Sequence, residues 1–255
     1  METKAELHTA QIGSCLVQYR NTTEFRKIHS EVFEHEEYAF ESDGPNPLII
    51  DCGAHIGLAT VYFKQKHPGA TVIAFEADER NVALLLKNVV SNELTDVRVI
   101  PAALWSDESG TMMYPDQEVS DGEIFTWGNT LIPNIWGNGA TSTESAVKTV
   151  RLSTYIDKTV DFLKMDIEGC EEIVLSEISD VIKNVRLLRI EFHGTNTSGA
   201  VNSLARILAL LDRKQFTYTV DYKDVKELFT PAEIDNVSPV IATIRAANSR
   251  EWKAS

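Results

Sequence analysis

Hydrophobic and polar positions follow two different periods along most of this chain. Short apolar runs predict strands, and stretches with apolar residues at helical spacing predict helices. From residue 47 onward the two kinds of segment alternate, which is typical of a parallel sheet with helices on its faces. The predicted strands are 47–53, 71–77, 97–105, 160–167 and 185–192, the predicted helices are 56–67, 79–92, 171–182 and 199–213, and the predicted closing strand pair is 216–222 with 239–246.

The first part of the chain does not follow this alternation. Residues 1–44 mix polar and apolar positions without clear β periodicity, and four apolar residues lie at helical spacing: Phe25, Ile28, Val32 and Phe33. A cluster of Gly, Pro and Asn follows at 43–47. We therefore predict an N-terminal helical extension over residues 1–44 and an α/β domain over residues 45–250.

A long irregular segment interrupts the predicted domain. Residues 114–148 are rich in Gly, Asn, Thr and Ser, and they include Trp127 and Trp136. Long loops inside compact domains are usually functional or disordered, and two tryptophans argue against disorder alone. We expect this inserted loop to be a lid or a wall of the substrate site. The alternative is an irregular segment that covers a sheet edge.

The composition indicates one well-buried core and a negatively charged surface. Hydrophobic residues make up 43% of the 255 positions, and 24 basic against 38 acidic residues give a net charge of −14. Such a surface repels phosphate backbones and anionic lipids, so we do not expect nucleic acid as a partner. No apolar run approaches the roughly 18 residues of a membrane span, and the first ten residues lack a signal-peptide pattern.

The three cysteines argue for a reducing compartment. Cys15, Cys52 and Cys170 are odd in number and far apart, which fits neither a disulfide framework nor a structural zinc site. We therefore expect a cytoplasmic protein. The oligomeric state is not indicated by the sequence.

A glycine-containing turn follows the first predicted strand of the domain. It reads Asp51-Cys-Gly-Ala-His-Ile-Gly57, whereas dinucleotide sites use G-x-G-x-x-G to hold a pyrophosphate at a helix N-terminus. Asp51 replaces the first glycine, and its carboxylate would repel phosphate and suit a cation. S-adenosylmethionine fits, since it has an adenosine but carries an ammonium and a sulfonium. We interpret His55 as a helix-start residue and Cys52 as buried packing.

A second acidic residue ends the next predicted strand. In open α/β sheets, ligands bind beyond the carboxyl ends of the strands, and an acid at this position accepts hydrogen bonds from ribose hydroxyls. Glu76 occupies this position. With Asp51 it predicts a two-point site for the cofactor. The alternative is that both acids are solvated residues at strand ends.

Polar side chains also end two later strands. Along 164–168, Lys164, Asp166 and Glu168 share one face of the strand, which is costly unless they pair or contact a ligand. The next strand ends in Glu191-Phe-His193. If the strands are neighbours, Asp166, Glu191 and His193 converge where the methyl group is delivered, and His193 suits removal of a hydroxyl proton.

Two other interpretations of this group stay open. It fits a structural hydrogen-bonded cluster, and carboxylates with an imidazole also suit a divalent metal. The sequence does not distinguish these cases, and we assign no metal ligand from it.

Together these segments resemble the FkbM-type S-adenosylmethionine-dependent methyltransferases. The resemblance covers roughly residues 45–195, and the K-x-D-x-E-G-x-E element that begins at Lys164 is its most specific part. It implies a Rossmann-like class I methyltransferase fold, with a mostly parallel seven-stranded sheet flanked by helices. It also implies O-methylation of a hydroxyl, often on a sugar, glycolipid or polyketide-type metabolite. The matching segments are 49–57, 74–77, 102–104, 161–171 and 189–193.

The resemblance also implies which residues hold the cofactor. The cradle residues bind the methionine part, Glu76 binds the ribose, and an acid after the third strand would contact the adenine, for which Asp107 is the candidate. Many family members have Asn where this chain has His55. The expected cofactor-binding residues are Asp51, Gly53, Ala54, His55, Gly57, Glu76, Ala77, Ala103, Asp107 and Asp166.

We therefore predict an S-adenosylmethionine-dependent O-methyltransferase that acts on a hydroxyl of a small molecule or glycan. The predicted catalytic residues are Asp166, Glu191 and His193. One alternative is an NAD-dependent oxidoreductase, against which Asp51 argues. The other is a binding module that holds the cofactor without turnover.

Overall fold

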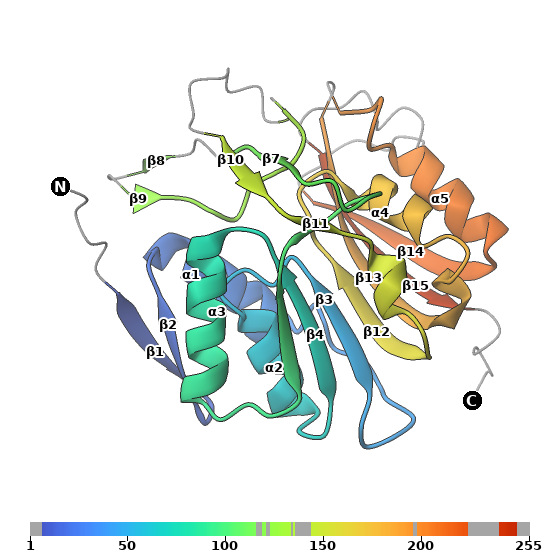
Figure 1. The fold of residues 1–255 in the computed structure, drawn as a ribbon. Coiled ribbons are helices and arrows are strands. Elements are labelled where there is room, and N and C mark those ends of the chain that lie inside the picture. The colour runs from blue at the N-terminus through green and yellow to red at the C-terminus, as the bar shows by residue number, and fades with distance from the viewer. Residues whose placement is uncertain are drawn as a thin grey trace.

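The computed structural model has a seven-stranded sheet at its centre, with helices on both faces (Figure 1). The strands lie in the order β14-β15-β13-β12-β3-β4-β5. Their bounds are β3 Leu48–Cys52, β4 Thr71–Glu76, β5 Val97–Pro101, β12 Val160–Met165, β13 Val185–Gly194, β14 Phe216–Lys223 and β15 Val240–Asn248. The structure describes residues 7–115, 119–120, 123–133, 135, 144–195, 198–223 and 240–248.

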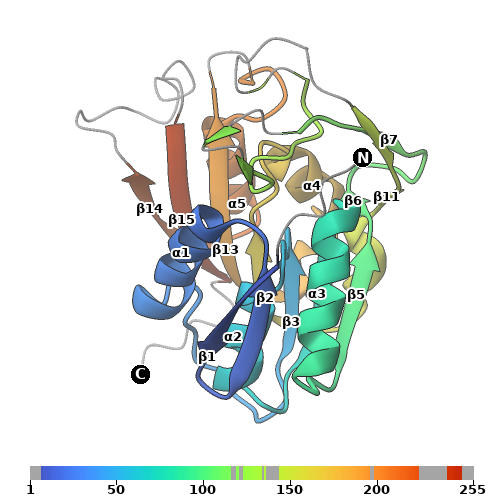
Figure 2. The same ribbon diagram turned by 90° about the vertical axis from the view of Figure 1, so that its left-hand side faces the viewer.

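The sheet is mixed rather than wholly parallel. The five strands from β13 to β5 pair in parallel, as the alternation of strands and helices predicted. β15 runs antiparallel to both β13 and β14, so it is the exception in direction, and the predicted closing pair is confirmed. In Figure 2 the arrows of β3 and β5 point toward the end of the sheet that the segments around β7 (Thr111–Met113) cover.

Four α-helices cover the two faces of this sheet. In Figure 2, α2 and α3 lie in front of the sheet, and α4 and α5 lie behind it. Consecutive strand residues face opposite layers: Phe162 packs with Phe63 of α2, while Leu163 belongs to the cluster that contains Val174 of α4. The bounds are α2 Leu58–Lys66, α3 Glu79–Ser91, α4 Glu171–Glu177 and α5 Leu204–Arg213.

Two of these helices are shorter than the sequence predicted. The predicted helix 171–182 gives α4 and then, after a turn, the 3-10 helix Ile182–Asn184. In place of the predicted helix 199–213, α5 begins at Leu204. The Ser203 side chain accepts a hydrogen bond from the Arg206 N–H and caps the helix there.

The N-terminal segment is only partly helical, which corrects the prediction for residues 1–44. A hairpin of β1 (His8–Ile12) and β2 (Cys15–Tyr19) precedes α1 (Thr22–His29) and the π-helix Ser30–Glu34. Gly13, with φ of 54°, allows the tight turn. Asn88 of α3 fixes the hairpin, since its side chain accepts from the N–H of Gln18 and donates to the carbonyl of Gln18.

Short strand pairs frame the segment that the sequence predicted as an inserted loop. β10 (Ser145–Val147) pairs with β7, and β11 (Thr149–Val150) pairs with β6 (Ala103–Leu104). The predicted strand 97–105 is therefore divided into β5, which belongs to the seven-stranded sheet, and β6, which pairs with β11. Residues 116–118, 121–122, 134 and 136–143, among them Trp136, lie outside the described residues. The bounds are β6 Ala103–Leu104, β7 Thr111–Met113, β8 Val119–Ser120, β9 Glu123–Ile124, β10 Ser145–Val147, β11 Thr149–Val150, and a 3-10 helix at Leu152–Tyr155.

Within the described segments, no helix has the length and apolar character that crossing a membrane requires.

Candidate active site

A cavity of about 840 Å³ lies beyond the carboxyl ends of β3, β4, β12 and β13. Its size falls within the range of about 300–1,000 Å³ that small-molecule sites occupy. Its wall includes the turn after β3, the end of β4, residues 102–104, residues 126–129 of the inserted loop, and the polar ends of β12 and β13. The predicted site positions thus lie mostly around one cavity.

The turn after β3 depends on Gly53. Gly53 has φ of 79°, and a Cβ there would lie 1.9 Å from the carbonyl oxygen of Asp166. The N–H groups of Gly53 and Ala54 both donate to the carbonyl of Phe75, at 3.1 and 2.8 Å. Glycine therefore lets the ends of β3 and β12 meet, and residues 53–55 form part of the cavity wall. Gly57, with φ of 93°, caps α2 and is not part of that wall.

Asp51 lies behind the turn and not on the cavity wall. Its side chain is fully buried, one oxygen accepts from the Thr60 hydroxyl at 2.9 Å, and the other lies 3.4 Å from Lys164 Nζ. The cation that Asp51 faces is therefore a lysine of this chain. Lys164, which does line the cavity, joins Asp51 to the turn at the cavity wall.

Lys164 is a site residue that the sequence reasoning left without a role. Its Nζ donates to the carbonyl of Gly53 at 2.9 Å and lies 3.5 Å from Asp166 Oδ2. Burial alone would lower its pKa, but Asp166 and Asp51 outweigh burial and raise the pKa above its ordinary value. Lys164 is thus a fixed cation beneath the turn and lines the cavity. The alternation along 164–168 predicts this face for Lys164.

Glu76 lies at the end of β4 and faces the cavity, as predicted. Its carboxylate accepts from the N–H groups of His55 at 2.7 Å, Asp78 at 2.8 Å and Ala77 at 3.0 Å. Burial raises its pKa to about 7, against the opposing effect of these backbone hydrogen bonds. Ala77 also lines the cavity.

His55 connects the turn to the inserted loop. It precedes α2 with φ of 51°, and its Nε2 lies 2.9 Å from the Thr126 hydroxyl. Burial lowers its pKa to about 4, so the ring is neutral. The buried carboxylate of Glu24 in α1 accepts from the N–H of Trp127 at 2.8 Å and from the N–H of Thr126. These contacts hold the loop over the cavity, and no sequence pattern indicated Glu24.

The segment after β5 contributes apolar residues to the wall rather than an acid. Ala103 lines the cavity together with its two neighbours. Asp107 lies in an exposed turn, where its carboxylate accepts from the N–H of Ser109 at 2.9 Å, and it is not part of the cavity wall. The structure therefore does not bring Asp107 to the position expected for adenine recognition.

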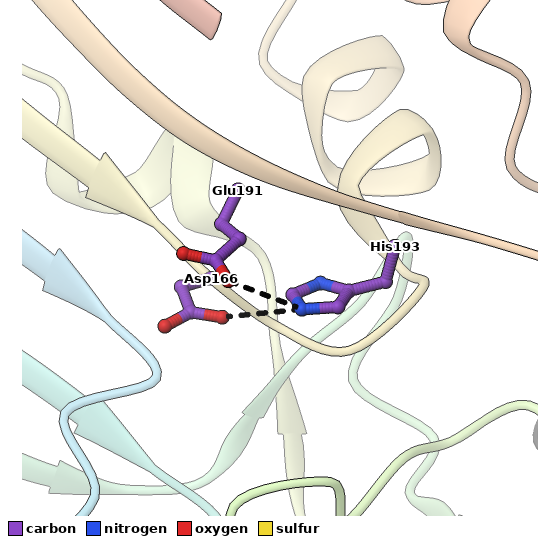
Figure 3. A group of neighbouring side chains, drawn as sticks. All are labelled: Asp166, Glu191 and His193. Atoms are coloured by element: carbon purple, nitrogen blue, oxygen red, sulfur yellow. Dashed lines mark ion pairs between the residues drawn. The ribbon is translucent and has the colours of Figure 1, made fainter. Parts of the chain in front are cut away.

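The three predicted catalytic residues converge, because β12 and β13 are neighbours. His193 Nε2 lies 3.7 Å from Glu191 Oε1 and 4.0 Å from Asp166 Oδ1 (Figure 3). Glu168 Oε2 lies 3.6 Å from the same nitrogen. All four residues line the cavity. Of the described residues, Asp166, Glu191 and His193 form the one group with metal-ligand spacing.

Buried carboxylates surround the imidazole of His193. Its Nδ1 lies 3.2 Å from Oε1 of Glu171, a fully buried carboxylate. Glu171 is the last residue of the K-x-D-x-E-G-x-E element, but the sequence analysis assigned it no role. Burial would lower the pKa of His193, but Glu168, Glu171 and Asp166 outweigh burial and raise it well above its ordinary value. The neighbouring carboxylates thus favour the protonated form of the imidazole.

Sequence comparison identifies the family once this geometry is known. The family model described as the methyltransferase FkbM domain matches residues 51–219, which include every strand end of the cavity. The chain belongs to the FkbM methyltransferase family. Its members are S-adenosylmethionine-dependent methyltransferases, so the enzyme class and the cofactor that the sequence predicted are confirmed.

Individual relatives of this FkbM-family protein are distant but nearly full-length. Methyltransferase sdnD of Sordaria araneosa is 26% identical over 226 residues, covering 76% of this chain and 83% of its own. The 31-O-demethyl-FK506 methyltransferase FkbM of Streptomyces tacrolimicus is 27% identical over 249 residues, covering 87% and 92%. The solved structure of Trm5b from Pyrococcus abyssi aligns with a TM-score of 0.50 at 12% identity, covering 96% of this chain and 56% of that one, which shows a shared fold.

Proposed function

We propose that this protein transfers the methyl group of S-adenosylmethionine to a hydroxyl oxygen of a small molecule or glycan. The observation that carries the proposal is that one cavity is lined both by Glu76 and by the group of Asp166, Glu191 and His193. The carboxylate of Glu76 suits the hydroxyls of a ribose, and the group around His193 suits a reacting hydroxyl. The relative from Streptomyces tacrolimicus, whose name describes methylation of an oxygen, supports the same chemistry.

The residues of the cavity fit the cofactor. A carboxylate has about four lone-pair sites, and the backbone hydrogen bonds to Glu76 use three of them, which leaves room for a ribose hydroxyl donor. The small side chains of Ala77 and Ala103 leave space for an adenine ring. The carboxylates of Asp166 and Glu191 favour a positive charge nearby, as a sulfonium carries. The cofactor itself supplies an activated methyl group.

The protein's own contribution to the reaction would be mostly positioning. Asp166, Glu191 and His193 face the cavity and can hydrogen-bond the acceptor hydroxyl, while the loop residues 126–129 exclude water from one side. The hydroxyl proton passes to a carboxylate beside the imidazole, and Glu168, which lines the same cavity, is one such group.

An aromatic surface beside these groups suits a flat or ring-shaped acceptor. Trp127 lines the cavity, and Lys27 Nζ lies 4.5 Å from the centre of its ring. This position supports the interpretation of the inserted loop as a substrate wall. Sugar rings and polyketide surfaces both pack on such a face.

Calorimetry with the purified protein tests the cofactor site. We expect S-adenosylhomocysteine to bind and NAD not to bind. We expect Glu76→Ala to lower the affinity for S-adenosylhomocysteine at least tenfold. Glu79→Ala, a change at an exposed residue three positions along, is the matched control and leaves the affinity unchanged. Binding of NAD alone would overturn the proposal.

An acceptor screen separates catalysis from cofactor binding alone. S-adenosylmethionine is incubated with the protein and with sugars, polyketides or short RNA, and mass spectrometry detects the added methyl group. We expect a product with a hydroxyl-bearing small molecule or glycan and none with RNA. Methylation of RNA would contradict the acceptor class, and loss of product in Asp166→Asn would exclude a binding module without turnover.

A further inference from the structure

We propose that Asp166, Glu191 and His193 bind a divalent metal ion that accepts carboxylate oxygen and imidazole nitrogen together, such as Mn²⁺ or Zn²⁺. One ligand atom from each residue lies within 4.8 Å of the other two (Figure 3). Imidazole suits zinc and carboxylates suit manganese, so a mixed set of this kind is typical of these ions.

The distances inside the group are those of ligands around an ion rather than of hydrogen-bonded partners. N–H···O hydrogen bonds have lengths of about 2.7–3.2 Å. His193 Nε2 lies 3.7 Å from Glu191 Oε1 and 4.0 Å from Asp166 Oδ1. Metal bonds to nitrogen and oxygen of about 2.0–2.2 Å allow two ligands of one ion to be up to roughly 4.2 Å apart. An ion between the three atoms is therefore compatible with both separations.

A buried carboxylate outside the group orients the histidine for this task. Glu171 Oε1 lies 3.2 Å from His193 Nδ1, so Nδ1–H donates to it and Nε2 faces Asp166 and Glu191. Histidines that bind metals almost always donate their second N–H in this way. Asn202 holds the other oxygen of Glu171 at 2.6 Å, so the orientation is fixed before any ligand arrives.

Two lysines orient the carboxylates. Lys164 Nζ lies 3.5 Å from Asp166 Oδ2, and Lys223 Nζ lies 3.1 Å from Glu191 Oε2. In each case the lysine contacts one carboxylate oxygen, and the other oxygen of the same carboxylate is the one paired with the histidine. The oxygens that remain, Asp166 Oδ1 and Glu191 Oε1, are those that face His193 Nε2. The polar partners thus direct one oxygen of each acid to a common point.

The ion would have a direct use in methyl transfer, and this step rests on the proposed function. A divalent ion in the cavity would bind the acceptor hydroxyl oxygen and lower its pKa. The proton passes to a neighbouring carboxylate such as Glu168, the oxygen forms the bond to the methyl carbon, and the bond from sulfur to that carbon breaks. The products are the methyl ether and S-adenosylhomocysteine.

Metal titration of protein freed of ions by EDTA and dialysis tests the site without any substrate. We expect Mn²⁺, followed by electron paramagnetic resonance and calorimetry, to bind at one site per chain. His193→Gln, Asp166→Asn and Glu191→Gln should each weaken it at least tenfold. Glu171→Gln, at a positioning residue, should weaken it about 10–100-fold. Asp157→Asn, at an exposed acid, is the control and leaves the affinity unchanged.

S-adenosylhomocysteine binding on the same samples separates this inference from the proposed function. Protein that binds S-adenosylhomocysteine but binds none of Mn²⁺, Zn²⁺ and Mg²⁺ overturns the metal site and leaves the methyltransferase intact. Metal binding that the three ligand variants do not change also overturns it, because the ion then lies elsewhere. Failure to bind S-adenosylhomocysteine counts against the proposed function alone. Thermal unfolding of each variant verifies that it is folded.

Discussion

Asp51 and Lys164 are register partners on β3 and β12, with Lys164 Nζ 3.4 Å from Asp51 Oδ1. The side chain of Asp51 is 0% exposed and that of Lys164 is 4% exposed, so neither charge is solvated by water. The lysine also donates to the carbonyl of Gly53, which joins the pair to the turn at the cavity wall. One ion pair thus connects the two strand ends that form the floor of the site.

Removal of one member of this pair should be costly. Lys164→Met leaves the charge of Asp51 buried without its partner, and we expect a loss of about 3–5 kcal/mol of stability. The double variant with Asp51→Asn should lose less than the sum of the two single changes. Urea unfolding of the four proteins measures this coupling. Additive losses would mean that the two charges do not stabilise one another.

A methyl group at position 53 should disrupt the same region sterically. The Cβ of Gly53→Ala would lie 1.9 Å from the carbonyl oxygen of Asp166, at φ of 79°. We expect a loss of at least about 2 kcal/mol and weak binding of S-adenosylhomocysteine. Gly44→Ala is the matched control, because nothing lies within 4 Å of its added Cβ. Equal melting temperatures of the two variants would contradict the close approach.

Local patterns sufficed for most of the sheet but not for the N-terminal hairpin. Residues 48–52 form a strand buried on both faces, and its apolar run at 48–50 is typical of such strands. The hairpin at residues 8–19 did carry one sequence signal, a Gly-Ser pair between its two strands. The helical spacing of later residues obscured it. Pro101 marks the end of β5, where the predicted strand continued too far.

The candidate site was predictable where it depends on strand ends and not where it depends on the sheet order. Glu76 and the group around His193 follow from period-two alternation at the ends of strands. The partner of Asp51 follows only from β12 lying beside β3, which no local pattern specifies. The contact of Glu24 with residue 126 joins segments 102 residues apart, and it arises from tertiary packing alone.

The raised pKa of Glu76 should make cofactor binding depend on pH. Burial raises this pKa to about 7, and the nearby carboxylate of Asp78 adds to the effect. Ribose hydroxyls donate best to an ionised carboxylate, so the bound state favours loss of the proton. Below pH 7 binding therefore releases a proton, and the affinity for S-adenosylhomocysteine should fall by up to about tenfold per pH unit. Above pH 7 it should be constant.

Calorimetry from pH 5.5 to 8.5, in buffers with different ionisation enthalpies, measures both the affinity and the proton release. His55 does not titrate in this range, because its pKa is lowered to about 4. Glu76→Gln removes the titrating group and keeps the size of the side chain, so its affinity should be lower and less dependent on pH. A Glu76→Gln profile as steep as that of the native protein would assign the effect to another group.

The carboxylate of Glu24 should control how firmly the inserted loop covers the cavity. Its side chain is only 6% exposed and accepts from the N–H groups of Thr126 and Trp127, so Glu24→Ala leaves both donors without this acceptor. We expect faster hydrogen exchange of residues 125–130 and several-fold weaker binding of S-adenosylhomocysteine, with a smaller effect on global stability. Glu34→Ala, at an exposed acid of the same N-terminal segment, is the control. Mass spectrometry of exchanged peptides localises the change. Unaltered protection of residues 125–130 in Glu24→Ala would show that the loop is held by His55 and the surrounding packing instead.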